Sequence, residues 1–200
     1  MGVRVGLLGG SFDPVHLAHI ALAQAALTGL DLDRVELIPA ANPWQRAPLA
    51  ASPADRIAML QLALRDAPRL SVNTIEIERG GQTYTADTLD QLPPNAEYYW
   101  ILGSDQLANF CSWHRWRDIA GQAHLAVAQR AGASASPPPE LRRHLDSLGR
   151  KLLALPFEPA SISSTQIRQH LAKGEPTDGL LDVAVAQYIR EKGLYQSPAQ

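Results

Sequence analysis

Short apolar segments alternate with segments of helical pattern along almost the whole chain. In the first part, VRVGLL and RVELIPA have the β-rich pattern, and LAHIALAQAAL and SPADRIAMLQLALRDA, at 17–27 and 52–67, have the helical pattern. Ser52 and Pro53 form a favourable cap and first turn for the second helix. Strands separated by crossover helices pair in parallel. The alternation therefore predicts an α/β fold with a parallel sheet.

The same alternation continues to the end of the chain. Further expected strands and helices are, in order, a strand at 70–78, a loop leading into a short helix at 83–92, a strand at 98–104, a short helix at 114–122, strands at 124–130 and 151–156, and closing helices at 163–174 and 180–193. Residues 131–140, AGASASPPPE, are expected to form an exposed loop. Gly174 and Gly193 end the closing helices, where left-handed geometry favours glycine. No second-domain boundary is visible.

Bulk properties limit the classes of partner. A chain of 200 residues is large enough for one ordinary domain. Its formal net charge of -2 offers no basic excess for nucleic acid or an anionic membrane. Cys111 is the only cysteine, which favours a reducing, cytoplasmic location, and we see no signal peptide or membrane span. We therefore expect a small-molecule partner, and the sequence leaves a homo-oligomer open.

The motif GGSFDPVHLAHI, at 9–20, follows the first expected strand. Paired glycines permit positive φ and allow another molecule to approach the backbone. Pro14 suits the first turn of a helix, and His16 and His19 would then share one face of it. Strand, glycine turn and helix start together indicate an anion pocket. The absence of a full G-x-G-x-x-G motif disfavours an ordinary dehydrogenase, and a zinc site would need three or four ligands.

Two further motifs each have a functional and a structural interpretation. In ISSTQIR, at 162–168, Ser163 and Gln166 fit a capping box, whereas Ser164, Thr165 and Arg168 also fit a phosphate site. In ILGSDQLANFCSWHRW, at 101–116, Gly103 and Asp105 would lie at the carboxyl edge of the sheet, where α/β folds bind ligands, although Asp105 could equally cap a helix. Trp113 and Trp116 fit either the core or a plate for a flat ring.

These motifs, in this order, resemble those of the bacterial nicotinate mononucleotide adenylyltransferases of the nucleotidyltransferase superfamily. The resemblance also includes SPADRIAMLQLAL, TYTADTL and the closing YIREKGLY, so it covers nearly the whole chain, 1–200, with ISSTQIR and the closing helices at 160–195. It implies a Rossmann-like open parallel sheet with helices on both faces, in a single domain. Two positions depart from the family: NPWQR replaces the usual Pro-Pro-His-Lys, and Ala18 replaces a glycine.

The resemblance implies adenylyl transfer from ATP to nicotinate mononucleotide, giving nicotinate adenine dinucleotide and pyrophosphate in NAD biosynthesis. Mg²⁺ would be carried on the ATP phosphates, with no separate metal site. In-line attack requires positive groups and N–H donors more than a protein nucleophile.

The implied catalytic residues are His16, His19 and Arg168. The expected ATP site comprises these three with Gly9, Gly10, Ser11, Phe12, Gly103, Asp105, Ser163, Ser164 and Thr165. The expected mononucleotide site comprises Ser11, Arg46, Thr85, Ala86, Asp105, Trp113 and His114.

Finer expectations concern the ring of the mononucleotide. Trp113 would stack on it, backbone groups around Thr85, Ala86 and His114 would meet its carboxylate, and Trp44 could cover the pocket.

Two rival functions remain. One is another transferase of the superfamily, such as the pantetheine-phosphate enzyme, against which TYTADT and SWHRW argue. The other is a nucleotide-binding protein without turnover, against which His16, His19 and Arg168 argue.

Overall fold

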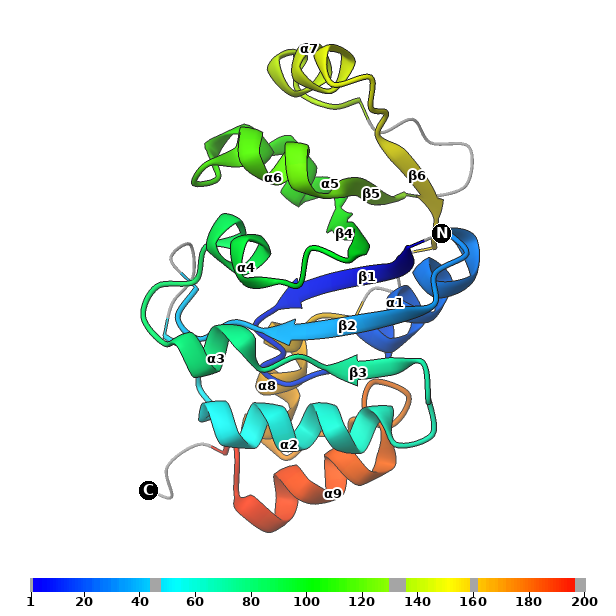
Figure 1. The fold of residues 1–200 in the computed structure, drawn as a ribbon. Helices are drawn as coiled ribbons and strands as arrows, with labels where there is room; N and C mark the ends of the chain where they lie inside the picture. Colours follow the sequence, from blue (N-terminus) through cyan, green and yellow to red (C-terminus); the bar gives the residue numbers. More distant parts are fainter. Residues whose placement is uncertain (1, 44–47, 130–135, 159–161, 197–200) are drawn as a thin grey trace.

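Six parallel strands form one sheet in the order β3-β2-β1-β4-β5-β6 (Figure 1). The computed structural model describes residues 2–43, 48–129, 136–158 and 162–196. The strands are β1 Val3–Gly10, β2 Arg34–Pro39, β3 Leu70–Val72, β4 Ala96–Gly103, β5 His124–Gln129 and β6 Leu153–Pro156. The strand order reverses between β1 and β4. At such a switch point the crossovers diverge and leave a crevice at the carboxyl edge of the sheet.

Helices cover both faces of this sheet. The helices are α1 Leu17–Gly29, α2 Pro53–Leu64, α3 Ile75–Arg79, α4 Thr85–Gln91, α5 Ser104–Ala108, the 3-10 turn η1 Phe110–Ser112, α6 Trp116–Gln122, α7 Pro139–Ser147, α8 Ser164–Lys173 and α9 Val183–Lys192. Helices α1, α2, α8 and α9 pack in one apolar cluster, and α4, α6 and α7 pack in the other (Figure 1). The predicted doubly covered, Rossmann-like single domain is confirmed.

Strand β4 shows how the sequence produces two cores. Tyr99 and Ile101 join the cluster with α1 and α2, whereas Trp100 and Leu102 join the cluster with α4 and α6. Successive side chains of a strand point to opposite faces, so a strand covered on both sides needs an unbroken apolar run. This explains why the apolar residues of YYWIL form a continuous run and do not alternate with polar residues. No helix in the described ranges has both the length and the apolar character to cross a bilayer.

The strand expected at 70–78 is only three residues long, and the second half of that segment is helix α3. Asn73 accounts for the change. Its Oδ1 accepts a hydrogen bond from the N–H of Ile75 at 3.1 Å, and its Nδ2 donates to Glu36 on β2 at 2.7 Å. An asparagine that bonds the backbone two residues on ends a strand and begins a turn. The prediction of one long strand was therefore wrong.

Helix α7 is an element that the sequence analysis did not predict. Pro139 occupies its first turn, and Leu141 and Leu145, one turn apart, are both buried. Both closing helices are confirmed, and each ends at a glycine in left-handed geometry, with φ of 70° at Gly174 and 61° at Gly193. The loop expected at 131–140 is described only from residue 136, and its last two residues belong to α7, so its predicted end was wrong.

Candidate active site

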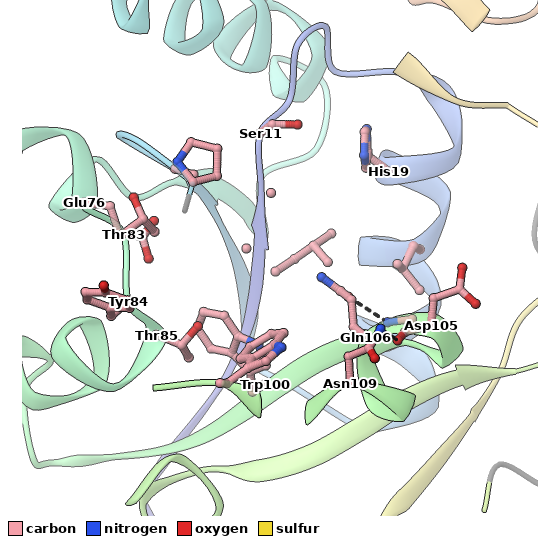
Figure 2. A pocket seen from close by; sticks show the side chains of 18 of the residues that line it. Ser11, His19, Glu76, Thr83, Tyr84, Thr85, Trp100, Asp105, Gln106 and Asn109 are labelled. Carbon is pink, nitrogen blue, oxygen red and sulfur yellow. Dashed lines mark hydrogen bonds between the residues drawn. The ribbon is translucent and has the colours of Figure 1, made fainter. Parts of the chain in front are cut away.

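Two adjoining cavities open at the carboxyl edge of the sheet, where β1 and β4 end. The first, the α4 cavity, has a volume of about 440 Å³ and lies beside α4 (Figure 2). The second, the α8 cavity, has a volume of about 910 Å³ and lies beside the start of α8. The residues lining both are Ser11, His19, Leu22, Gly103, Asp105, Gln106 and Ser164. The two cavities therefore form one site with two compartments.

The paired glycines at the end of β1 are required by close packing. A Cβ on Gly9 would lie 2.9 Å from the indole of Trp100, and one on Gly10 would lie 2.9 Å from the ring of Phe12. The residue with positive φ in this motif is Phe12, at 47°, and not either glycine, so that expectation was wrong. The Phe12 ring is fully buried and packs edge-on against His19 at 5.0 Å. Its side chain supports the site from the core and lines neither cavity.

Helix α1 begins at Leu17 rather than at Pro14, which precedes it in a cis peptide bond with Asp13. His16 is therefore the N-cap residue. The expected proximity of the two histidines is confirmed, since their rings stack with centroids 3.7 Å apart. The backbone N–H of His16 donates to Nδ1 of His19 at 3.3 Å. Because Nδ1 accepts, Nε2 carries the proton in the neutral His19 ring.

The His16 ring is uncharged at neutral pH in the protein without nucleotide. It is 7% exposed, and its Nδ1 has no hydrogen-bond partner among the described residues. Burial lowers the pKa of His16 to about 4 because desolvation disfavours the charged imidazolium. The sequence analysis counted His16 among the positive groups of the site. The structure instead makes it a neutral imidazole.

The start of α8 is fixed to the loop that precedes α1. The Oγ of Ser163 accepts from the N–H of Gln166 at 3.3 Å, which confirms the predicted cap. The hydroxyl of Ser164 donates to the carbonyl of Pro14 at 2.9 Å, and Nη1 of Arg168 donates to the carbonyl of Asp13 at 2.7 Å. The capping and site interpretations of ISSTQIR are thus compatible, since Ser163, Ser164, Thr165 and Arg168 also line the α8 cavity.

Asp13 is a buried carboxylate that the sequence analysis did not single out. Its oxygens accept from the N–H groups of Ala50 and Ala51, at 2.7 and 3.0 Å, and from the Tyr195 hydroxyl at 2.7 Å. Arg56, fully buried, donates to the carbonyl of Ser11 at 2.9 Å. Burial raises the pKa of the Tyr195 hydroxyl, which keeps it a donor. Together with the hydrogen bonds from α8, these contacts fix loop 11–16 to α2, to the residues before α2 and to Tyr195 near the C-terminus.

Thr85, Trp113 and His114, three of the residues expected in the mononucleotide site, line the α4 cavity; their contact with a mononucleotide stays a prediction. Trp113 is half-buried and packs on Phe110, with ring centroids 5.2 Å apart. Trp116, by contrast, is a core residue. Ala86 is fully buried within α4 and lies behind the cavity wall.

Other residues of the α4 cavity were not foreseen, and two predicted residues lie outside the part of the chain that the structure describes. Trp100, Glu76, Gln106 and Asn109 also line the α4 cavity. Gln106 and Asn109 lie within the segment 101–116 that the sequence analysis singled out, whereas no local motif marks Trp100 or Glu76. Asp105 lines both cavities and lies one residue inside α5, so it is not the N-cap residue. Arg46 and Trp44 lie outside the described residues.

Glu76 is the second buried carboxyl group of the site. It is 3% exposed, and its Oε1 accepts a hydrogen bond from the Thr88 hydroxyl at 2.7 Å. Burial raises the pKa of Glu76 to about 7, although the bond from Thr88 and the charge of Arg79 act in the opposite direction. The α4 cavity therefore contains a carboxyl group whose pKa is raised well above its ordinary value.

Fold and site together define a doubly wound α/β protein with a two-compartment, nucleotide-sized site at its switch point. The chain belongs to the cytidylyltransferase-like family, whose model matches residues 7–170. The probable nicotinate-nucleotide adenylyltransferase of Bordetella petrii is 58% identical over 193 residues, which cover 96% of this chain and 99% of the relative. The one from Bordetella pertussis is 58% identical over 197 residues, covering 98% and 100%.

A solved structure supports the fold from a distant sequence. The Plasmodium falciparum nicotinic acid mononucleotide adenylyltransferase, complexed with NaAD, superposes with a TM-score of 0.77 at 18% identity, covering 96% of this chain and 97% of that one. The resemblance expected from the ordered motifs is confirmed by the Bordetella relatives, which cover 96% and 98% of the chain.

Proposed function

We propose that this protein transfers the adenylyl group of ATP to nicotinate mononucleotide, giving nicotinate adenine dinucleotide and pyrophosphate in NAD biosynthesis. The observation that carries the proposal is the pair of cavities that meet at Ser11, His19 and Asp105. One compartment is lined with phosphate-binding groups and the other with aromatic rings. Two nucleotides placed end to end would bring their phosphates together at the shared residues.

The α8 cavity provides the groups that such a transfer requires. In-line displacement at the α-phosphorus develops charge on phosphate oxygens, and N–H donors stabilise it more than a protein nucleophile would. His16, His19 and Arg168 supply these donors, together with the first N–H groups of α8, a helix of ten residues, which have no acceptor within the helix. His16 would gain a proton as the triphosphate arrives, because a nearby anion favours the imidazolium.

The α4 cavity fits the mononucleotide. Trp113 offers a ring face for stacking, and Thr85, with the buried Ala86 behind it, begins a helix whose first N–H groups have no partner within the helix. A carboxylate only accepts hydrogen bonds, so N–H donors suit nicotinate better than nicotinamide. We also propose Arg46, which follows β2 in the sequence, as a phosphate contact. Gly9 and Gly10 line the α4 cavity and not the α8 cavity, so their contact with ATP stays a prediction.

Mg²⁺ is proposed to enter with ATP and to neutralise charge on its phosphates. Mg²⁺ prefers oxygen ligands and is usually held by one or two carboxylates together with substrate phosphates and water. Asp105, an exposed carboxylate lining both cavities, is the protein group that fits this role. The single cysteine of the chain, Cys111, supports a reducing, cytoplasmic location.

Pyrophosphate release with ATP and a panel of acceptors tests the proposal. Nicotinate mononucleotide, nicotinamide mononucleotide and phosphopantetheine should be compared at equal concentrations, with Mg²⁺ present and with Mg²⁺ chelated. We expect the highest kcat/KM with nicotinate mononucleotide and loss of turnover on chelation. Turnover with phosphopantetheine alone would favour the rival transferase, and binding of ATP without turnover on any acceptor would favour a nucleotide-binding protein.

A further inference from the structure

Glu76 is a carboxyl group in the wall of the α4 cavity that adenylyl transfer does not require. It lies on α3 and is almost completely buried, yet it contributes to the cavity lining. Figure 2 shows Glu76 with Thr83, Tyr84 and Thr85 along one side of the cavity, facing Gln106 and Asn109 across it. A ring bound in this cavity would share it with the Glu76 carboxyl group.

The contacts of Glu76 leave its charge only weakly supported. The Thr88 hydroxyl donates to Oε1 at 2.7 Å. Arg79, one turn along α3, directs its guanidinium to Thr88 at 3.2 Å and to Gln91 at 3.3 Å. A buried carboxylate needs several donors or a directly paired cation to remain ionised. One hydroxyl and the field of Arg79 only partly offset the burial, so Glu76 titrates near neutral pH.

The other titratable groups around Glu76 do not take over the role of Arg79 in offsetting its burial. Tyr84 and His114 line the same cavity, with ring centroids 4.6 Å apart. On β2, which packs against α3, Glu36 is engaged by Arg34 at 2.8 Å and by Asn73 at 2.7 Å. Arg79 is the charged side chain whose interaction with Glu76 counters its burial.

We infer that Glu76 determines specificity for the ring substituent of the mononucleotide: its neutral form admits an anionic substituent, and its ionised form opposes one. The inference rests on the proposed function. A carboxylate on the ring would meet a like charge in a water-poor cavity once Glu76 loses its proton, whereas an uncharged amide would not. Discrimination between the two mononucleotides should therefore depend on pH.

The test is the ratio of kcat/KM for nicotinate mononucleotide to kcat/KM for nicotinamide mononucleotide, measured from pH 6 to pH 8.5. Ionisation of ATP, of the mononucleotide phosphate and of His16 and His19 affects both substrates, so it cancels in the ratio. For the unchanged protein the ratio should fall about tenfold as pH rises through 7, the effect of an interaction worth one pKa unit. For Glu76→Gln the ratio should stay high and flat.

Two variants keep the carboxyl group and move its titration. Thr88→Val removes the donor that favours the ionised form, and Arg79→Met removes the positive charge while keeping the aliphatic stem. Both should shift the fall of the ratio to higher pH. Glu78→Gln, an exposed carboxylate on the same helix, is the matched control and should keep the unchanged profile. If Glu76→Gln fails to fold, the first two variants carry the test.

Parallel profiles for the unchanged protein and Glu76→Gln would overturn the inference, as would a shift of the Thr88→Val profile to lower pH. Either result would leave the proposed function intact, because nicotinate mononucleotide would still be consumed. Absence of pyrophosphate release with both mononucleotides would instead contradict the proposed function, and the inference would fall with it.

Discussion

At the scale of single residues, the charge of His16 is set by its surroundings rather than by its place in the motif. The ring is buried against His19 and has a pKa of about 4. His16→Ala should lower kcat about a hundredfold or more, the size of losing one donor to a transition state, with the fold retained. Initial rates at saturating ATP measure this. His144→Ala, at a partly buried position of α7 that lines neither cavity, is the control; near-normal turnover in His16→Ala would refute the catalytic role.

The same burial predicts proton uptake when ATP binds. His16 is neutral in the free protein at pH 7, and the triphosphate should raise its pKa toward or above the ordinary value. Calorimetric titration with ATP in two buffers of different ionisation enthalpy reports the number of protons taken up. We expect a positive number at pH 7 that is reduced in His16→Ala. Equal uptake by both proteins would place the proton elsewhere.

Sequence could predict that the two histidines meet but not their protonation. Their spacing of three residues is local information, whereas the burial that sets the pKa of His16 comes from the packing of the whole loop. Asp13 and Glu76 illustrate the same division. Their partners are Tyr195, at the far end of the chain, and Thr88, on another helix. Nothing in the neighbouring sequence specifies either contact.

At the scale of elements, α8 combines a structural cap at Ser163 with Arg168, a side chain that lines the α8 cavity. Arg168 also holds the carbonyl of Asp13, so Arg168→Ala should raise KM for ATP at least tenfold and lower kcat as well. Ser163→Ala removes the cap and should mainly lower the free energy of unfolding, by about 1 kcal/mol. Urea unfolding and steady-state kinetics on both variants measure these effects. If both variants were destabilised equally and KM for ATP did not change, ISSTQIR would be a helix cap with no role in ATP binding.

Elements whose signals are local were predicted correctly, and those shaped by a side-chain contact were not. Ser52, Ser163, Gly174 and Gly193 mark helix ends by their own geometry. Strand β3 stops early because Asn73 bonds both to β2 and to the backbone of α3. Helix α7 was missed because its apolar face consists of few residues in a charged sequence and follows a run of prolines.

At the scale of the whole molecule, His16 and Glu76 give stability opposite dependences on pH. The pKa of His16 falls from 6.5 in the unfolded chain to about 4, so the unfolded chain binds more protons and stability is lost as pH drops from 6.5 toward 4. The pKa of Glu76 rises from 4.5 to about 7, so stability is lost as pH rises through that range. Between pH 4.5 and 6.5 the two contributions oppose each other.

Removing one of the two groups should expose the other. Glu76→Gln lacks the ionisation of Glu76, so its free energy of unfolding relative to the unchanged protein should increase by on the order of 3 kcal/mol between pH 4.5 and pH 8. Urea unfolding at intervals of half a pH unit measures the difference, with Glu78→Gln on the exposed side of the same helix as control. Because this readout needs no substrate, it tests the burial of Glu76 independently of the reaction. A difference that stays constant with pH would show that Glu76 titrates like an ordinary exposed carboxyl group, and its place in the cavity wall would then carry no pH-dependent specificity.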